Sequence, residues 1–328
     1  MSIKKTIAFL MAVLFLIACL IGCSRANGNV KRQNASVAII TKGSNSDFWD
    51  DVKNGAFSAG TEYNLAVTFE GPESEEDYEA QNQMIENAVS RGVSVIILSA
   101  IDYENNAAAA QKAVDKGIKL ITVDSDVDVS AKELFIGTDN VSAGTKAGEQ
   151  AINFCSDRDT INIGIVNYGE NTENGKQRIK GFSEYIEKNE KAQIVATVNI
   201  ESNIESATSG AKYLLEQHKD IDVLVGFNEW STLGVGCAIK ELGLKDEVYG
   251  IGFDSNVSCV GMLETGEIDT LIVQNPFSMG YLSVSKAAEI LSGNKTQSVI
   301  ETDTYVVTRE NMFSPDVQKI LFSFSENN

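Results

Sequence analysis

The feature that most constrains this fold is a strand, loop and helix pattern that recurs along most of the chain. Its first copy is Ser36–Leu65. Residues 37–41 form an apolar, β-branched run that predicts a buried parallel strand, and the polar residues 42–47 lead into a helix from about Phe48. Similar pairs follow at a spacing of roughly 25–30 residues, a pattern typical of parallel, doubly wound α/β sheets with helices on both faces.

The length of the chain predicts two domains of this kind. Its 328 residues exceed what one hydrophobic core usually serves. The first series of strands and helices ends at a short strand over residues 135–140, and a second series of similar plan begins with the helix that follows. The C-terminal segment from Pro315 is polar and partly helical by its pattern.

The first 23 residues have a different character. Lys4 and Lys5 precede an apolar run, Ile7–Ile21, which predicts a secretory signal. The run ends in Leu-Ile-Gly-Cys at Cys23, which resembles the lipobox of bacterial lipoproteins, whose cysteine is lipidated and becomes the new N-terminus. Cys19 is a second match, but a polar segment follows Cys23. We therefore predict a signal peptide over 1–22 and a tether over 23–35, with an uncleaved membrane anchor as the alternative.

Charge and cysteine content narrow the range of partners. The formal net charge is −19, and removal of two lysines with the signal would leave −21, which disfavours nucleic acid and anionic lipid headgroups. Cys155, Cys237 and Cys259 lack metal-ligand spacing, although one disulfide could form among them. A single histidine excludes a multi-histidine zinc site. We therefore expect neither a metal nor a cofactor.

The first loop is a candidate ligand site. In open α/β sheets, ligands bind beyond the carboxyl ends of the strands, where this loop should lie. Phe48 and Trp49 stand at its end, and aromatic rings at a helix start either pack in the core or form a flat wall for a sugar ring.

Several short segments resemble the ribose-binding family of periplasmic sugar-binding proteins, in their order and spacing, over nearly all of Ser36–Arg309. They are NSDFW at 45–49, ITVD at 121–124, GTDN at 137–140, RIKGF at 178–182, and GFD at 252–254 with QNP at 274–276. The resemblance implies a type I periplasmic binding protein fold, in which two doubly wound parallel-sheet lobes are joined by a three-crossover hinge and the sugar lies between them.

The resemblance also implies domain limits. The N-terminal lobe would comprise residues 36–139 and 275–302, and the C-terminal lobe with its tail residues 140–274 and 303–328. The hinge would lie at three pairs of residues, which are Asp139 and Asn140, Gln274 and Asn275, and Thr302 and Asp303.

By the same comparison, two aromatic residues would stack on the sugar and two aspartates would accept hydrogen bonds from its hydroxyls. An arginine and side-chain amides would also bind the sugar. The implied ligand-binding residues are Lys42, Ser46, Phe48, Trp49, Ser99, Asp124, Ser125, Arg178, Asn228, Asp254 and Gln274. These residue types suit sugars because carboxylates and an arginine form charge-assisted bonds with hydroxyls, and aromatic rings cover apolar ring faces.

Three positions depart from the family pattern. Ser125 stands where arginine is common, Lys42 where a small polar residue is common, and Trp230 where an acid is common. A lysine beside Arg178 could suit an anionic sugar. The alternative is a neutral aldose held by rearranged hydrogen bonds.

The sequence therefore predicts an extracytoplasmic, lipid-anchored, monomeric protein that binds a monosaccharide by hinge closure and delivers it to the permease of an ABC importer. The rival hypothesis is sensing, in which the closed form docks on a membrane histidine kinase or chemoreceptor. A glycoside-processing enzyme would need two carboxylates around a scissile bond. Asp124 and Asp254 come from similar loops of opposite lobes, which suits a clamp better, and we expect no enzymatic activity.

Overall fold

The computed structural model describes residues 35–322. The predicted signal peptide over 1–22, the lipidation site Cys23, nearly all of the predicted tether and the last six residues of the tail lie outside the described residues. Within the described part of the chain, no helix combines the length and the apolar character needed to cross a membrane.

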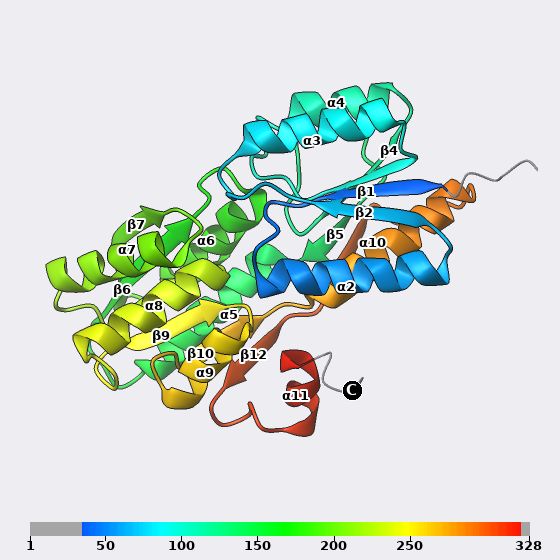
Figure 1. Cartoon of the computed structure of the whole chain (residues 1–328). Helices are drawn as coiled ribbons and strands as arrows, with labels where there is room; N and C mark the ends of the chain where they lie inside the picture. Colours follow the sequence, from blue (N-terminus) through cyan, green and yellow to red (C-terminus); the bar gives the residue numbers. More distant parts are fainter. Residues whose placement is uncertain (1–34, 323–328) are drawn as a thin grey trace, which may run out of the picture. The chain divides into compact units, whose positions relative to one another are not determined.

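One six-stranded parallel sheet, with the order β11-β5-β4-β3-β1-β2, lies in what we call the first lobe. Its strands are β1 (Ser36–Ile40), β2 (Ala66–Glu70), β3 (Val95–Leu98), β4 (Lys119–Val123), β5 (Leu134–Thr138) and β11 (Val299–Thr302). Helices α2 (Asp47–Glu62) and α10 (Pro276–Leu291) cover one face, and α3 (Tyr78–Arg91) and α4 (Ala107–Asp115) cover the other (Figure 1).

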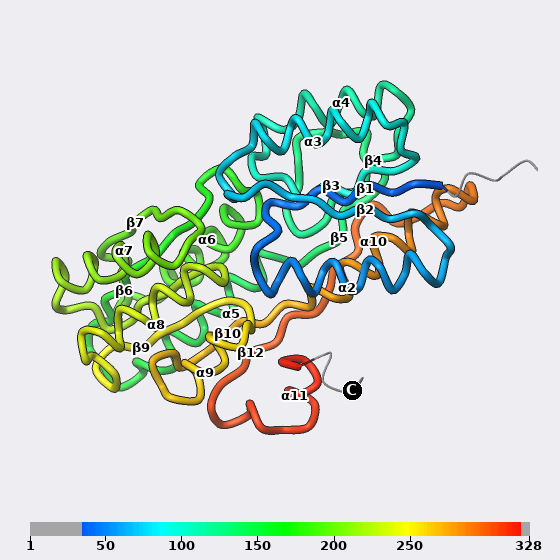
Figure 2. Tube along the Cα trace, viewed as in Figure 1, coloured from blue at the N-terminus to red at the C-terminus, as the bar shows by residue number. Residues whose placement is uncertain are grey.

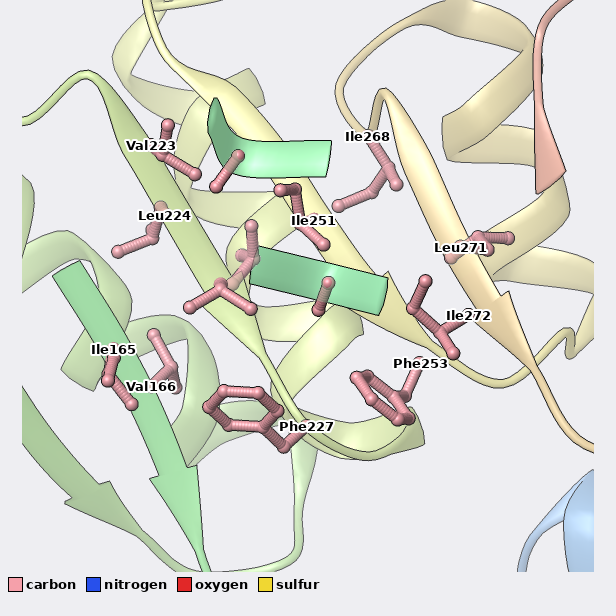
Figure 3. Close-up of a cluster of buried hydrophobic side chains, with 14 of the residues drawn as sticks. Ile165, Val166, Val223, Leu224, Phe227, Ile251, Phe253, Ile268, Leu271 and Ile272 are labelled. Carbon is pink, nitrogen blue, oxygen red and sulfur yellow. The ribbon is translucent and has the colours of Figure 1, made fainter. Parts of the chain in front are cut away.

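The second lobe contains a sheet of the same size, with the order β12-β10-β9-β8-β6-β7. Its strands are β6 (Ile161–Tyr168), β7 (Ala192–Ile200), β8 (Val223–Gly226), β9 (Tyr249–Phe253), β10 (Thr270–Val273) and β12 (Tyr305–Thr308). Its helices are α5 (Asn140–Phe154), α6 (Glu173–Ile186), α7 (Ile204–Gln217), α8 (Glu229–Leu242), α9 (Val257–Thr265) and α11 (Pro315–Leu321). Side chains from β6, β8, β9 and β10 form much of its core, with Phe227 and Phe253 near the strands' carboxyl ends (Figure 3).

The chain passes between the two lobes three times, as the trace in Figure 2 shows. It passes from β5 to α5, from β10 to α10, and from β11 to β12. This architecture confirms the predicted α/β fold class with two doubly wound lobes. The last strand of the second lobe is β12, which runs antiparallel to β10 because only two residues separate it from β11 in the other lobe. The sequence analysis missed β11, a four-residue edge strand of which only Thr302 is buried.

The three cysteines in the described part of the chain are free. Cys155 and Cys259 are buried, and Cys237 is half-buried. The disulfide that the sequence left open is therefore not formed in this structure.

Paired glycines allow one helix pair in each lobe to pack backbone against backbone. Between α5 and α6, a Cβ atom added to Gly181 would lie 2.0 Å from the carbonyl oxygen of Val141, and one added to Gly144 would lie 2.0 Å from that of Arg178. Gly55 and Gly280 give the same close approach between α2 and α10. The α5–α6 contact matters for the site, because it fixes the helix that carries Arg178.

We predict that Gly181→Ala destabilises the protein. Overpacking costs about 1–3 kcal/mol in well-packed cores, and here the obstructing atom belongs to the backbone and cannot rotate away. The control is Gly261→Ala in α9, where an added Cβ has no neighbour within 4 Å and helix propensity favours alanine by up to about 1 kcal/mol. Urea denaturation of both variants measures the difference; equal stabilities would contradict the close-packing argument.

Candidate functional site

A cavity that opens to solvent, with about 300 Å³ of empty space counted together with its mouth, is lined by residues from both lobes. Nine of the predicted ligand-binding residues line it, namely Lys42, Ser46, Phe48, Trp49, Asp124, Arg178, Asn228, Asp254 and Gln274. Ser99 and Ser125 are buried beside Asp124 and do not line the cavity. Ser99 donates a hydrogen bond to Asp124, whereas the buried hydroxyl of Ser125 has no hydrogen-bond partner among residues 35–322.

The fold brings these side chains together because most of them follow strand ends. In the first lobe, Lys42 comes two residues after β1 and Asp124 directly after β4. In the second lobe, Asp254 and Gln274 directly follow β9 and β10, and Asn228 caps α8 just after β8. The carboxyl ends of parallel strands share one edge of a sheet, which is where ligands bind in such folds.

Asp124 is the most heavily bonded group of the first lobe. Its carboxylate pairs with the Lys42 Nζ at 3.1 Å and accepts the Ser99 hydroxyl at 3.1 Å. The Asn174 amide of the second lobe donates to both of its oxygens, at 3.0 and 3.1 Å. Its backbone is left-handed, with φ of 60°, a conformation that aspartate tolerates better than most residues. Asp124 therefore holds Lys42 in place and also connects the two lobes.

Arg178 organises the second lobe. Its guanidinium is buried and donates to the Asn140 side chain at 2.8 Å, the Phe227 carbonyl at 2.6 Å and the Gln274 side chain at 2.7 Å. It lies over the ring of Phe253, with 4.8 Å from Cζ to the ring centroid. These contacts leave the guanidinium held rigidly at the wall of the cavity.

Asp254 offers an unused acceptor in the cavity wall. The Gln274 amide donates to its Oδ1 at 2.6 Å, and Oδ2 accepts no hydrogen bond from the described residues. Like Asp124, it has a left-handed backbone, with φ of 70°. Asn228 complements it, because its Oδ1 caps α8 while its Nδ2 donates to no acceptor in the described chain. The wall thus presents an unused acceptor and an unused donor.

The aromatic residues lie at the cavity as predicted, in a geometry that the sequence could not specify. Phe48 and Trp49 meet edge to face, with centroids 5.0 Å apart and planes at 90°. Trp49 is only 2% exposed and its indole N–H donates to Glu75 at 3.0 Å. Because the rings are perpendicular, only one of them can lie flat on a given sugar ring.

Lys42 does not stand free in the cavity. Burial acts to lower its pKa, but Asp124, Tyr168 and Glu75 outweigh this effect and hold the pKa above its usual value. Its Nζ lies 5.8 Å from the Trp49 ring centroid and 5.7 Å from that of Tyr168. The lysine is charged and already paired with Asp124 in the cavity wall. This pairing weakens the hypothesis that Lys42 and Arg178 together bind an anionic sugar.

The chain matches a model of the periplasmic binding protein domain over residues 37–295. The chain belongs to this family. Ribose-binding and allose-binding proteins of this family are among the curated relatives of the chain. The chain is 24% identical over 287 residues to the D-ribose/D-allose-binding protein of Pseudomonas aeruginosa, covering 83% of this chain and 88% of the relative. It is 22% identical to the ribose import binding protein RbsB of Bacillus subtilis, covering 87% and 90%.

Solved structures of this periplasmic binding protein family agree with the fold. A carbohydrate transporter solute binding protein from Agrobacterium radiobacter, in complex with D-arabinose, is 27% identical, has a TM-score of 0.85 and matches over 88% of this chain and 99% of its own. A sugar transporter from Clostridium phytofermentans is 33% identical, with a TM-score of 0.77 over 84% and 99%. The type I periplasmic binding protein fold is confirmed, and membership in this family of extracytoplasmic, non-enzymatic binding proteins confirms that the chain is not an enzyme.

The predicted hinge residues of this periplasmic binding protein lie where the chain passes between the lobes. Asp139 caps α5 and Asn140 begins it, Gln274 and Asn275 connect β10 to α10, and Thr302 and Asp303 connect β11 to β12. The side chains of Thr138 and Gln274 also join two of the crossovers, with a hydrogen bond of 2.9 Å. Their role in hinge motion remains a prediction.

Five further residues line the cavity and were not among the predicted ligand-binding residues, although the sequence analysis noted Trp230 as a departure from the family pattern; they are Glu75, Tyr168, Asn174, Glu229 and Trp230. Signals for two of them were present. Asn174 lies four residues before Arg178, on the same face of a helix, and Glu229 directly follows Asn228. No group of three or more possible metal ligands occurs among residues 35–322, so the described site offers no metal centre.

Glu229 is a buried acid that connects the lobes. It accepts the Phe48 backbone N–H of the first lobe at 3.4 Å and is 6% exposed. Burial, helped by Asp254 and Glu75, raises its pKa from 4.5 to about 7, although hydrogen bonds from Asn256 and Phe48 act in the opposite direction. The folded state therefore keeps the Glu229 proton to a higher pH than the unfolded chain does.

We predict that Glu229→Gln stabilises the protein at pH 8 but has little effect at pH 4. Because the folded pKa is raised, wild-type stability falls as pH rises from 4.5 to about 7, and the full loss is on the order of 3 kcal/mol. Glutamine cannot ionise and avoids this loss. Thermal denaturation of both proteins from pH 4 to 8 tests this, with the exposed Glu264→Gln as control. Parallel wild-type and variant curves would contradict the argument.

Proposed function

We propose that this chain is an extracytoplasmic sugar-binding lipoprotein that captures a monosaccharide or sugar derivative between its lobes and delivers it to an ABC importer. The observation that carries the proposal is the cavity wall itself. It combines an acceptor on Asp254, a donor on Asn228 and aromatic rings, with contributions from both lobes. Relatives named as ribose, allose and arabinose binders support the sugar class.

The chemistry of the wall suits hydroxyl groups, each of which donates and accepts. The free Oδ2 of Asp254 can accept a charge-assisted hydrogen bond from one hydroxyl, and the Asn228 amide can donate to its neighbour. Phe48 or Trp230 supplies apolar surface for the C–H face of a pyranose or furanose ring. A ligand that contacts both lobes favours the closed arrangement, because those contacts are complete only when the lobes meet.

A thermal-shift screen of residues 24–328 against neutral monosaccharides tests the proposal. We predict that at least one aldose stabilises the protein, by about 2.7 kcal/mol at 100 times its Kd. Asp254→Asn should abolish the shift, because an amide replaces the accepting carboxylate. Asp159→Asn, at an exposed position of the second lobe, should leave it intact. A shift that survives Asp254→Asn would remove this aspartate from the site.

Lipidation of Cys23 is a separate proposal that rests on the sequence. We predict that Cys23→Ser releases the protein from the membrane fraction and prevents incorporation of labelled fatty acid, while Cys19→Ser, at the second possible match, does neither. Fractionation of cells that express each variant measures this. Release by Cys19→Ser alone would move the anchor to that residue.

A sensing role is the second candidate function, and one similar structure favours it. A chain in the solved structure of an XylFII-LytSN complex is 28% identical in sequence to this chain, with a TM-score of 0.78 over 84% of this chain. A protein of this fold therefore forms a complex with another protein. Deletion of the gene distinguishes the two roles: loss of labelled-sugar uptake supports import, whereas intact uptake with loss of a sugar-dependent transcriptional response supports sensing.

A further inference from the structure

The cavity that we assign to the ligand carries more negative than positive side chains. Its lining includes four carboxylates, from Glu75, Asp124, Glu229 and Asp254, and two cations, Lys42 and Arg178. A neutral sugar requires no such excess of acid. An anionic sugar would meet repulsion from it.

Both cations are already engaged by the protein. Lys42 pairs with Asp124 at 3.1 Å and is 4% exposed. Arg178 is 1% exposed, and its hydrogen bonds to Asn140, Phe227 and Gln274 occupy all three guanidinium nitrogens. Lys42 also attracts Glu75, whereas Glu229 forms no ion pair with any described residue, and the lining as a whole sets four acids against two cations.

An adjoining cavity of about 290 Å³ extends the acidic lining. It shares Phe48, Glu229, Asp254 and Gln274 with the first cavity and adds Asp47 and Asp51, and its lining contains no lysine, arginine or histidine. Glu229 and Asp254 lie between the two spaces. A ligand that enters through this second cavity passes acidic side chains, which favours a cation over an anion.

Burying like charges together is unfavourable, and the acids show this cost. Burial together with neighbouring acids raises the pKa of Glu229 to about 7 and that of Asp51 to about 6, and burial also raises the pKa of Glu75 and Asp254. A positive group placed among them would relieve this cost.

We infer that the ligand of this cavity is a sugar that bears a positively charged amino group, held by Glu229 and Asp254 while its hydroxyls meet Asn228 and its ring meets the aromatic wall. This inference rests on the proposed sugar-binding function and specifies its ligand class. Asp254 lines both cavities and keeps an unused oxygen, and Glu229 accepts only one backbone N–H, at 3.4 Å, and a side-chain bond from Asn256. These two carboxylates can therefore accept the three N–H donors of an ammonium group.

Isothermal titration calorimetry on the mature chain at pH 7 tests the ligand class with matched probes. The probes are D-glucosamine, D-galactosamine and D-mannosamine, their parent hexoses, and the corresponding uronic acids. We expect at least one amino sugar to bind about tenfold or more tightly than its parent, since a hydrogen bond to a charged group contributes about 1.5–3 kcal/mol. We expect no binding of the uronic acids.

Glu229→Gln should remove most of the preference for the amino sugar over its parent hexose. The readout is the ratio of the two affinities, because any effect of the substitution on lobe closure acts on both ligands alike. Glu264→Gln, at an exposed position, is the matched control and should keep the preference. A salt titration of the wild-type protein gives a readout that needs no variant: amino-sugar affinity should fall with added salt, and parent-hexose affinity should not.

The outcomes separate this inference from the proposed function. Binding of neutral hexoses or uronic acids in preference to every amino sugar would overturn the inference and leave sugar binding in place. Failure of all three classes to bind would count against the sugar-binding function itself. A preference for amino sugars that Glu229→Gln leaves unchanged would overturn the assignment of the amine to this side of the cavity.

Discussion

The buried guanidinium of Arg178 is the constraint on which the rest of the site depends. A charge that leaves water must find hydrogen-bond partners, or its burial costs several kcal/mol. Asn140 begins the segment after the first crossover, Gln274 begins the second crossover, and the Phe227 carbonyl belongs to the core of the second lobe. One side chain therefore connects two of the three passages between the lobes. Substitution of Arg178 would remove a hydrogen-bond donor from each of these three buried groups.

The carboxylates opposite this arginine are built in the same way in the two lobes. Asp124 directly follows β4 and Asp254 directly follows β9, and both have positive φ angles. Left-handed backbone at a non-glycine residue costs on the order of 1–3 kcal/mol and is found mainly where surrounding structure enforces it. Here the apolar strands beneath each aspartate supply that structure. The strain places one acid from each lobe at the cavity.

The sequence allowed much of this to be predicted, because the signals were local. Short segments that resemble the ribose-binding family, each of them local in the sequence, implied Asp124, Arg178 and Asp254 as ligand-binding residues. Glu75 and Tyr168 were missed because nothing in their own segments separates a cavity wall from an ordinary loop or strand. The pairing of Lys42 with Asp124 was missed for a related reason. The two residues are 82 positions apart, and they meet only because β1 and β4 lie on either side of β3 in the sheet. Charge balance in a cavity is a property of the fold, and no single motif contains it.

The contacts between the lobes use acids that also surround the ligand cavity. Asn174 of the second lobe binds Asp124, and the Phe48 backbone N–H of the first lobe binds Glu229. Outside the cavity, Glu76 accepts the Ser202 N–H across the same divide at 2.7 Å. A positive or hydroxyl group that binds Glu229 therefore acts on a carboxylate that also bears on lobe closure. Ligand binding and closure are then thermodynamically linked through shared atoms, because any change in the charge of Glu229 alters both its bond to the first lobe and its attraction for the ligand.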